Sequence, residues 1–554
     1  MARDPLDDTG PWNPGISSQV PAHLRPLATV LRPENVTTPV AGAIELQKLT
    51  GLPLAELVAF QPRRLVLHEL LVRVMADFSV PDGSRIEDLG INFREIVHRL
   101  LTRYVEPRMQ DINAAFLGLR SELAQTLLAA FPSRWDMPEI AGLEARSAAT
   151  DDRLASVSYL CLARVMSALY KVHGRPWGSR ELIVSLATDL ASNIAGSELI
   201  GDLLDPLLLE AAAEQRYRLL PSQSHPVVIN TKGPSASGKS TLRPLQKRLA
   251  GTLGVSWSDF ALISPDIWRK QLLDYGTLGS AYKYAGPLTS EELQIVDQKL
   301  DRYMMRKQRR GATSHVLIDR FRLEEAVSNL LTSQGHDVYL FFMITPPELL
   351  VERAWNRGLK VGRYKSVDDT LAHGVEAYTG MPDAFLGWIR RANRIHFEFL
   401  DNSVRFGDLP RTVAFGSNDT LQVLDVGRML DIERFGRVNV DARSPQELYP
   451  DKRLLVPERN VGFLRRCIKE FREVVFADQA SGRVYLRMVE GKPALVDHEA
   501  LQSALLNPDV HASLEAIAPG VRIGSSPGKR YLQYLNEPNN EGFPTIGQWG
   551  RATP

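Results

Sequence analysis

The stretch VVINTKGPSASGKST, residues 227–241, decides the fold of the middle of the chain. It matches the pattern G-x-x-x-x-G-K-[ST] at every fixed position between Gly233 and Ser240. The apolar run Val227–Asn230 precedes the match, and the helical stretch Leu242–Leu249 follows it. A strand, a glycine-rich loop and a helix in this order are the context that a phosphate-binding loop requires, and a chance match would not bring that context with it.

The residue types of the loop explain how it would bind a nucleotide. Gly233 and Gly238 let the backbone curl so that successive N–H groups point at a phosphate. Lys239 would reach the β- and γ-phosphates, and the Ser240 hydroxyl would be a ligand of Mg²⁺. We therefore predict ATP and Mg²⁺ as cofactors. The predicted ATP-binding residues are Gly233, Ser235, Ala236, Ser237, Gly238, Lys239, Ser240 and Thr241.

Apolar runs on both sides of the loop predict an α/β core. After the run that precedes the loop, further runs at 260–263, 315–318, 338–344 and 397–400 alternate with helical stretches. Such alternation is typical of a parallel sheet with helices on both faces. The predicted parts of the chain are a flexible tail (1–39), an all-helical domain (40–220), the phosphate-loop domain (221–435) and a small α+β C-terminal region (436–554).

Apolar stripes predict the helical domain. Leu67, Leu70, Leu71 and Val74 follow the i, i+3, i+4, i+7 spacing of one helix face, and similar stripes recur near 93–100 and 162–169. Such stripes indicate a helical bundle without chemistry of its own. In the C-terminal region, the runs 484–489 and 494–496 around a turn at 490–492 predict a hairpin.

The composition limits the partners and the compartment. The 554 residues carry a formal net charge of +1, from 66 basic and 65 acidic side chains. This balance attracts neither nucleic acid nor an anionic membrane, although the basic run 306–310 leaves a local nucleic-acid contact open. The chain has two cysteines, no apolar segment of membrane-spanning length and no signal peptide at its start. We therefore expect a cytoplasmic protein without a membrane partner.

A second acidic position follows the next predicted strand. Asp266 and Arg269 come directly after the run 260–263, at the strand end where ligand crevices form in such sheets. Transfer of phosphate to a hydroxyl needs a carboxylate that accepts the hydroxyl proton. The alternative is a helix start, with Ser264 as N-cap and Asp266 favourable toward the helix dipole.

Several of these pieces resemble one family. The loop Gly233–Thr241 and Asp266-x-x-Arg269 resemble the zeta-toxin and polynucleotide-kinase group of P-loop kinases, over about 222–435. His-Val-Leu-Ile-Asp at 315–319 resembles the second acidic strand of that group, whose Asp approaches magnesium. Phe-Glu-Phe-Leu-Asp-Asn-Ser at 397–403 resembles its late strand. The resemblance implies an ATP-dependent kinase with Asp266 as catalytic base and Asp319 near the metal. Asp319 as a buried partner of Lys239 without a metal role stays open.

The spacing between the two motifs bears on the phosphate acceptor. Lys239 and Asp266 are 27 positions apart, longer than in a typical zeta toxin. A longer gap resembles the plant-pathogen effector branch, which phosphorylates the adenosine ribose of NAD. We therefore expect a nucleotide-like small-molecule acceptor, with NAD ahead of UDP-N-acetylglucosamine. Asp266, Arg269 and the insert 275–286 with its three tyrosines would form the acceptor site, although the tyrosines could also be packing residues.

A basic helix follows the strand 338–344. Arg353 and Arg357 lie four residues apart, and Arg363 follows after Gly362. Like charges at this spacing repel, which suggests a compensating anion. In the resembled family a lid at this place clamps the transferring phosphoryl group, so Lys239, Arg353, Arg357 and Arg363 join Asp266 as predicted catalytic residues. The alternative is a solvated basic helix.

Three functions stay open at this point. They are a small-molecule kinase, a polynucleotide 5′-hydroxyl kinase, and an ATP-controlled binding module that transfers no phosphate. The resembled family pairs toxic kinases with a helical inhibitor, which implies a regulatory protein partner or inhibition in cis by the helical domain. A role as toxin, effector or housekeeping enzyme does not follow from the residues.

Overall fold

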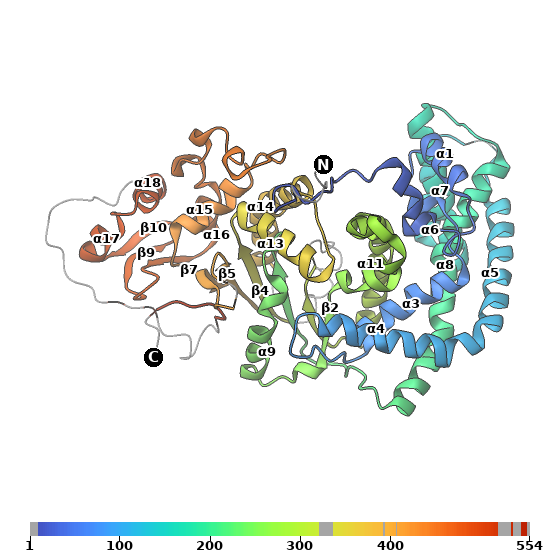
Figure 1. The fold of residues 1–554 in the computed structure, drawn as a ribbon, viewed down its shortest axis with the longest axis horizontal. Coiled ribbons are helices and arrows are strands. Elements are labelled where there is room, and N and C mark those ends of the chain that lie inside the picture. Colours follow the sequence, from blue (N-terminus) through green and yellow to red (C-terminus); the bar gives the residue numbers. More distant parts are fainter. Residues whose placement is uncertain are drawn as a thin grey trace, which may run out of the picture. The chain divides into compact units, whose positions relative to one another are not determined.

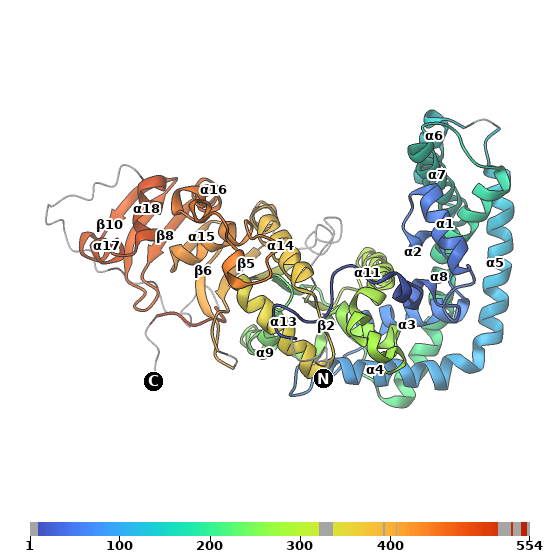
Figure 2. The same ribbon diagram turned by 45° about the horizontal axis from the view of Figure 1, so that its top comes forward.

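The structure, a computed structural model, describes residues 9–133, 135–320, 336–391, 394–405, 407–518, 533, 535 and 545–550. The chain forms two compact units, and each is described by itself. The sheet unit comprises residues 1–18, 221–264 and 307–554, and the helical unit comprises residues 19–220 and 265–306. Figures 1 and 2 show the elements of both units in two views.

One mixed sheet forms the sheet unit. Its ten described strands lie in the order β10-β9-β8-β7-β6-β5-β4-β1-β3-β2. Neighbours from β2 to β5 run parallel, whereas β6 pairs antiparallel with β5. The strands are β1 Val227–Lys232, β2 Phe260–Ile263, β3 His315–Ile318, β4 Asp337–Ile344, β5 Arg394–Asp401, β6 Arg411–Ser417, β7 Thr420–Val423, β8 Glu473–Ala477, β9 Val484–Val489 and β10 Lys492–Val496.

The sheet confirms the predicted strands and is larger than predicted. All five runs predicted between 222 and 435 form parallel strands. The sheet does not end there, because β7 pairs in parallel with β8 and so carries the sheet into the C-terminal region. β6, β7 and β8 were not predicted, since short apolar runs do not separate strands from buried helix segments. The predicted hairpin is present, and its turn is shorter than expected: Lys492 already pairs with Val489, and Glu490 and Gly491 both have positive φ.

Helices cover the sheet through an aromatic core. Phe342 of β4 and Phe399 of β5 are register partners with stacked rings, and Phe385 packs edge-on against both. Phe385 belongs to α14 and also contacts Phe463 of α16. This packing holds β4 and β5, and therefore the residues that follow them. The helices are α9 Arg243–Thr252, α13 Pro347–Val361, α14 Val367–Ile389, α15 Val426–Phe435, α16 Gly462–Glu470, α17 His498–Ala504 and α18 Pro508–Ile517.

The helical unit confirms the apolar stripes, since Leu67, Leu70, Leu71 and Val74 are all buried. Its N-terminal helices are α1 Val40–Thr50, α2 Leu54–Leu57, α3 Pro62–Asp77, α4 Asp88–Leu100, α5 Met109–Ala130, α6 Met137–Ala149, α7 Arg153–His173 and α8 Arg180–Gln215. Residues 265–306 add the turn η7 Pro265–Trp268, α10 Arg269–Leu272, η8 Tyr275–Tyr284 and most of α11 Ala285–Arg309. Among the described residues, no helix has the length and apolar character to cross a membrane.

Residues 265–306 pack against α3 within the helical unit. The Glu292 carboxylate of α11 is fully buried and accepts hydrogen bonds from Arg64 at 2.5 and 2.7 Å and from His68 at 2.7 Å. The segment predicted as a tail also takes part: the turns η1 Ala22–Leu27 and η2 Thr29–Leu31 are formed, and Val30 and Leu31 are buried. Residues 1–8 of that segment lie outside the described residues.

Candidate active site

The loop between β1 and α9 has the backbone of a phosphate-binding loop. Gly233, Ala236 and Gly238 all have positive φ, at 151°, 66° and 95°. At Gly238 a Cβ atom would lie 2.2 Å from Nδ2 of Asn402, so only glycine fits between the loop and the end of β5. Among the described residues, no backbone carbonyl outside helices and strands accepts a hydrogen bond from the N–H groups of Ala236 or Gly238.

Lys239 begins the short helix η5, Lys239–Leu242, which leads into α9. Its ammonium donates to the carbonyl oxygens of Gly233 and Pro234, both at 3.0 Å. The cation is thus folded over the start of the loop. A phosphate oxygen carries more charge than a carbonyl oxygen and would compete for the same ammonium.

The structure brings Ser240 and Asp319 together. Ser240 Oγ donates to Asp319 Oδ2 at 2.9 Å, and the Asp319 N–H donates to the carbonyl of Ile263 at 2.9 Å, which places this acid beside the end of β2. Two hard oxygen donors next to the loop suit Mg²⁺, which keeps few protein ligands and several water or phosphate ligands. The described residues contain no group of three or more His, Cys, Asp or Glu side chains that could hold a metal ion.

The carbonyl of Ser237 ties the loop to β4, β5 and α13. It accepts hydrogen bonds from Asn402 Nδ2 at 2.7 Å, from Thr345 Oγ1 at 3.3 Å and from Arg353 Nη1 at 3.5 Å. The buried Tyr378 hydroxyl in turn bonds both the N–H and the carbonyl of Thr345 at 2.8 Å. Asn402, Thr345 and Tyr378 were not predicted as site residues. Only the Asp-Asn-Ser sequence at 401–403 pointed to this place.

The three predicted lid arginines lie in two environments. Arg353 is half-buried and donates to the carbonyls of Asn402 at 2.7 Å and Val404 at 3.3 Å, so its guanidinium supports the loop. Arg357 and Arg363 lie near Lys365. Burial and these two arginines lower the pKa of Lys365 to about 8, while Asp369 opposes the shift. Arg357 and Arg363 thus lie near Lys365 and its partner Asp369, whereas Arg353 has a different set of partners, and the lid role of the three arginines stays a prediction.

A further lysine lies directly before the loop. The β1–β3 register pairs Asn230 with Ile318, and Lys232 and Arg320 each lie two residues further along from this pair. Burial, then the charges of Arg320 and Lys239, lower the pKa of Lys232 to about 7. Neighbouring cations that lower one another's pKa are stabilised when an anion binds between them. The sequence signal for Lys232 was a lysine that ends an apolar strand immediately before the first loop glycine.

Asp266 and Arg269 belong to the helical unit. The turn η7 starts at Pro265, as the helix-start alternative predicted. Arg269 Nε donates to Asp266 Oδ1 at 3.1 Å, and its Nη1 donates to the Gly286 carbonyl and to Thr289 Oγ1, both at 2.7 Å. The Asp266 side chain is 45% exposed. Arg269 is thus a fixed support for a carboxylate that solvent or a substrate can reach.

The tyrosines of the insert pack in the helical unit. Tyr275, Tyr282 and Tyr284 lie against an apolar cluster that includes Leu278 and Leu288, together with residues 20–28. The three tyrosine rings thus contribute to apolar packing, which was the alternative interpretation of this insert. Recognition of a nucleotide base by these rings stays a prediction.

No family model and no curated protein matches the chain. The chain is similar to a structure from the PezAT chromosomal toxin–antitoxin system of the human pathogen Streptococcus pneumoniae (17% identity, TM-score 0.26, 36% of this chain and 75% of that chain). It is also similar to structures of the AvrRxo1-ORF1:-ORF2 complex, native (14%, TM-score 0.28, 48% and 79%) and with ATP (12%, TM-score 0.26, 48% and 72%). TM-scores this low carry no conclusion about this chain.

Proposed function

We propose that the chain is an ATP-dependent kinase that transfers the γ-phosphate to a hydroxyl of a nucleotide-containing small molecule, such as NAD or UDP-N-acetylglucosamine. The observation that supports this most is the 2.9 Å hydrogen bond between Ser240 and Asp319, next to a loop with three positive-φ residues. This bond joins two residues 79 positions apart beside the loop, which supports the proposal because phosphate transfer uses a loop hydroxyl and a nearby acid to hold Mg²⁺.

The residues of the chain would share the work of transfer. Loop N–H groups bind the phosphates, and Lys239 exchanges its two carbonyl partners for phosphate oxygens. Ser240 and Asp319 would hold Mg²⁺, which neutralises charge on the phosphates when bound. Asp266, oriented by Arg269, accepts the proton of the acceptor hydroxyl. Arg357 and Arg363 supply charge-stabilising guanidinium groups.

The central experiment offers ATP with Mg²⁺ and one acceptor at a time: NAD, UDP-N-acetylglucosamine, free nucleosides or a 5′-hydroxyl oligonucleotide. Mass spectrometry then detects the gain of one phosphate. Lys239→Ala should abolish transfer, whereas Lys247→Ala, at an exposed position of α9, should leave it unchanged. Transfer to the oligonucleotide alone would establish a polynucleotide kinase. ATP binding without transfer to any acceptor in the panel or in a metabolite extract would favour a binding module.

Asp266→Asn tests the base separately. General bases contribute typically about 10²–10⁴-fold in rate. The variant should keep its ATP affinity and lose transfer by about 10²–10⁴-fold in kcat, and a loss of less than about tenfold would contradict the role as base. Such a loss would assign Asp266 to the helix start alone.

A further inference from the structure

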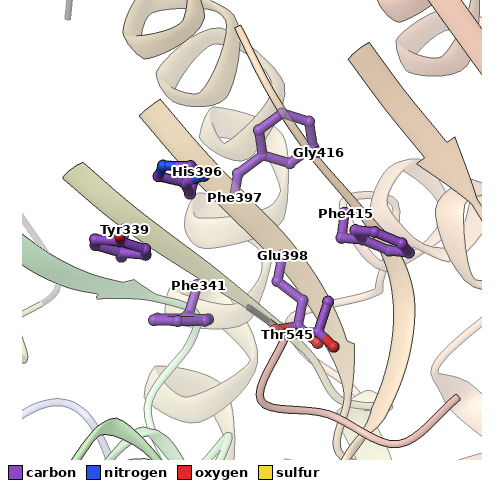
Figure 3. A pocket seen from close by; sticks show the side chains of 8 residues that line it. All are labelled: Tyr339, Phe341, His396, Phe397, Glu398, Phe415, Gly416 and Thr545. Atoms are coloured by element: carbon purple, nitrogen blue, oxygen red, sulfur yellow. The ribbon is translucent and has the colours of Figure 1, made fainter. Parts of the chain in front are cut away.

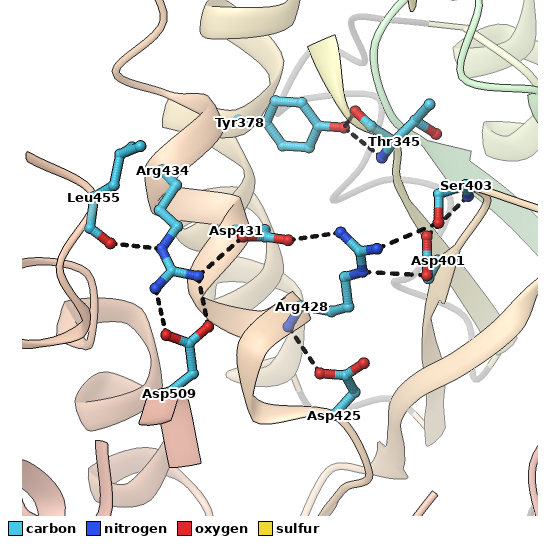
Figure 4. A network of polar contacts seen from close by, with 10 residues as sticks. All are labelled: Thr345, Tyr378, Asp401, Ser403, Asp425, Arg428, Asp431, Arg434, Leu455 and Asp509. Carbon is cyan, nitrogen blue, oxygen red and sulfur yellow. Dashed lines mark hydrogen bonds and ion pairs between the residues drawn. The ribbon is translucent and has the colours of Figure 1, made fainter. Parts of the chain in front are cut away.

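Arg428 of α15 contacts both residues that flank Asn402. Its Nε lies 3.2 Å from Asp401 Oδ2, and its Nη2 donates to Ser403 Oγ at 3.4 Å (Figure 4). Asn402 lies between them, and its side-chain amide holds the Ser237 carbonyl of the phosphate loop at 2.7 Å. Arg428 therefore holds the side chains on both sides of Asn402, the residue that forms the shortest of the side-chain hydrogen bonds to the Ser237 carbonyl.

A second guanidinium holds the same segment. Arg353 donates to the carbonyls of Asn402 and Val404. The Asp401 side chain is 3% exposed, so its charge relies on protein partners instead of water. Two arginines, Arg353 of α13 and Arg428 of α15, thus contact residues 401–404 and fix their position.

The contacts of Arg428 continue away from the loop as alternating charges. Arg428 Nη1 lies 2.8 Å from Asp431 Oδ2, and Asp431 Oδ1 lies 3.2 Å from Arg434 Nη1. Arg434 also forms a two-pronged pair with Asp509 of α18, at 2.8 and 2.7 Å, and donates to the Leu455 carbonyl at 2.8 Å (Figure 4). Asp425 accepts a hydrogen bond from the Arg428 N–H and caps α15, the helix that carries Arg428, Asp431 and Arg434.

We propose that Arg428 is a positioning residue for the phosphate loop, and that the ion-pair chain Asp401–Arg428–Asp431–Arg434–Asp509 couples helix α18 to that loop. The nucleotide role of the loop rests on the proposed function, whereas the positioning does not. Each ion pair in this series joins two charged side chains that are both well over half shielded from water. Dissolved salt therefore weakens these pairs less than it weakens an exposed pair. Removal of Arg428 leaves Asp401 buried beside Asn402 without this partner, and the loop loses the fixed position of Asn402.

The test compares Arg428→Gln with Arg483→Gln in the full chain. Arg483 donates through Nε and Nη2 to one oxygen of the buried Asp497, and its strand β9 lies several strands away from the loop in the same sheet. Hydrogen exchange of peptides from 233–241 should be faster in Arg428→Gln than in the native chain, and unchanged in Arg483→Gln. ATP affinity by calorimetry should fall about tenfold in Arg428→Gln alone, the effect of one lost charge-assisted contact. Arg428→Lys keeps the charge without the fork and should lie between.

The outcomes separate the two proposals. Faster loop exchange without any ATP binding by the native chain would uphold the positioning role and refute the nucleotide role. Equal loop exchange in the two Gln variants would overturn the positioning role. If Arg428→Gln does not fold, Asp509→Asn at the far end of the chain replaces it. That variant should speed loop exchange by a smaller factor, and no change would also overturn the coupling.

Discussion

At Gly238 the absence of one carbon atom lets the loop and β5 approach each other. The residue combines a φ of 95° with a neighbouring amide nitrogen that would lie 2.2 Å from any Cβ. Both features penalise every other residue type: backbone strain of this kind costs of order 1–3 kcal/mol, and the Asn402 amide must move. Sterics thus select the residue type at this position of the loop, in addition to the hydrogen bonds that hold the Ser237 carbonyl.

Gly238→Ala should lower the free energy of unfolding by about 1–3 kcal/mol and weaken ATP binding, because Asn402 must release the Ser237 carbonyl. Gly251→Ala in α9 is the matched control. A Cβ there meets nothing within 4 Å and φ is not positive, so the change should be neutral or stabilising by about 0.4–1 kcal/mol. Urea denaturation and calorimetry measure both effects. Equal stability of the two variants would contradict the steric account.

We predict that Lys232 makes the proposed ATP binding depend on pH. Its pKa is lowered from 10.5 to about 7 by burial, Arg320 and Lys239, so much of the free protein carries a neutral amine at pH 8. A bound triphosphate favours the charged form and should draw a proton from solution. Calorimetry at pH 8 in two buffers of different ionisation enthalpy counts the protons taken up. Lys232→Met and Lys232→Arg should both lose the uptake, and only the Arg variant should retain affinity; unchanged uptake would assign the proton elsewhere.

At the scale of elements, one buried carboxylate joins α3 to α11. Glu292 is fully buried and paired with Arg64 and His68, and His68 continues to Lys299 at 3.0 Å. Burial, then the charge of Lys299, lower the pKa of His68 to about 3, so the ring is neutral and can link the two charged groups. The helices are therefore matched by polar contacts in addition to apolar ones.

Glu292→Gln should lower the free energy of unfolding by about 3–5 kcal/mol, because it leaves the cation of Arg64 without its buried counter-charge. Arg63→Ala on the same helix is the control. Its pair with Glu106 is exposed, and exposed pairs contribute about 0–1 kcal/mol. Urea denaturation of both variants decides the matter. A cost below about 1 kcal/mol for Glu292→Gln would show that the buried cluster relaxes or admits water.

A second buried carboxylate attaches residues 545–550 to the sheet. Glu398 of β5 accepts hydrogen bonds from the N–H groups of Ile546 and Gly547 at 2.7 and 3.0 Å and from Thr412 Oγ1 at 2.7 Å. Figure 3 shows its side chain and Thr545 lying close together beside the strands. Burial raises the pKa of Glu398 from 4.5 to about 7, against the opposing effect of these three donors.

The sign of the pH dependence follows from this shift. Between pH 4.5 and about 7 the folded chain retains a proton on Glu398 that the unfolded chain has lost, so stability falls as the pH rises through this window. Glu398→Gln should remove that slope from the free energy of unfolding measured by urea denaturation across the window. Glu499→Gln, at an exposed position of α17, should retain it. An unchanged slope in Glu398→Gln would assign the titration to another group.

At the scale of the whole molecule, the chain order does not follow the compact units. Residues 265–306 leave the sheet unit after β2, pack with residues 19–220, and the chain then returns to form β3. The helical unit is thus assembled from two separate stretches. Removal of residues 19–220 alone would leave residues 265–306 without the residues that they pack against.

A chain that begins at Gln215 should therefore misfold. Glu292 and Lys299 would lose their buried partners on α3, and the apolar cluster around Leu288 would lose residues 20–28. We expect aggregation or rapid proteolysis of residues 265–306, measured by size-exclusion chromatography and limited digestion against the full chain. A soluble, protease-resistant product would show that this stretch folds alone. Inhibition in cis by the helical domain stays a proposal, and point variants in the full chain are the suitable test.

The amino-acid sequence by itself determined the parts that depend on neighbouring residues. The loop 233–241 and the strands on either side of it follow from local steric rules and apolar runs, whereas Asp319 was indicated only by a family resemblance and its hydrogen bond with Ser240 came from the tertiary structure. Only the tertiary structure decided that Asn402 holds the loop, that Arg353 supports it, and that Arg428 links it to α18. It also decided that residues 265–306 belong with the helices. These contacts join positions far apart along the chain, and no local spacing records them, because a side chain's partner is set by which elements pack together.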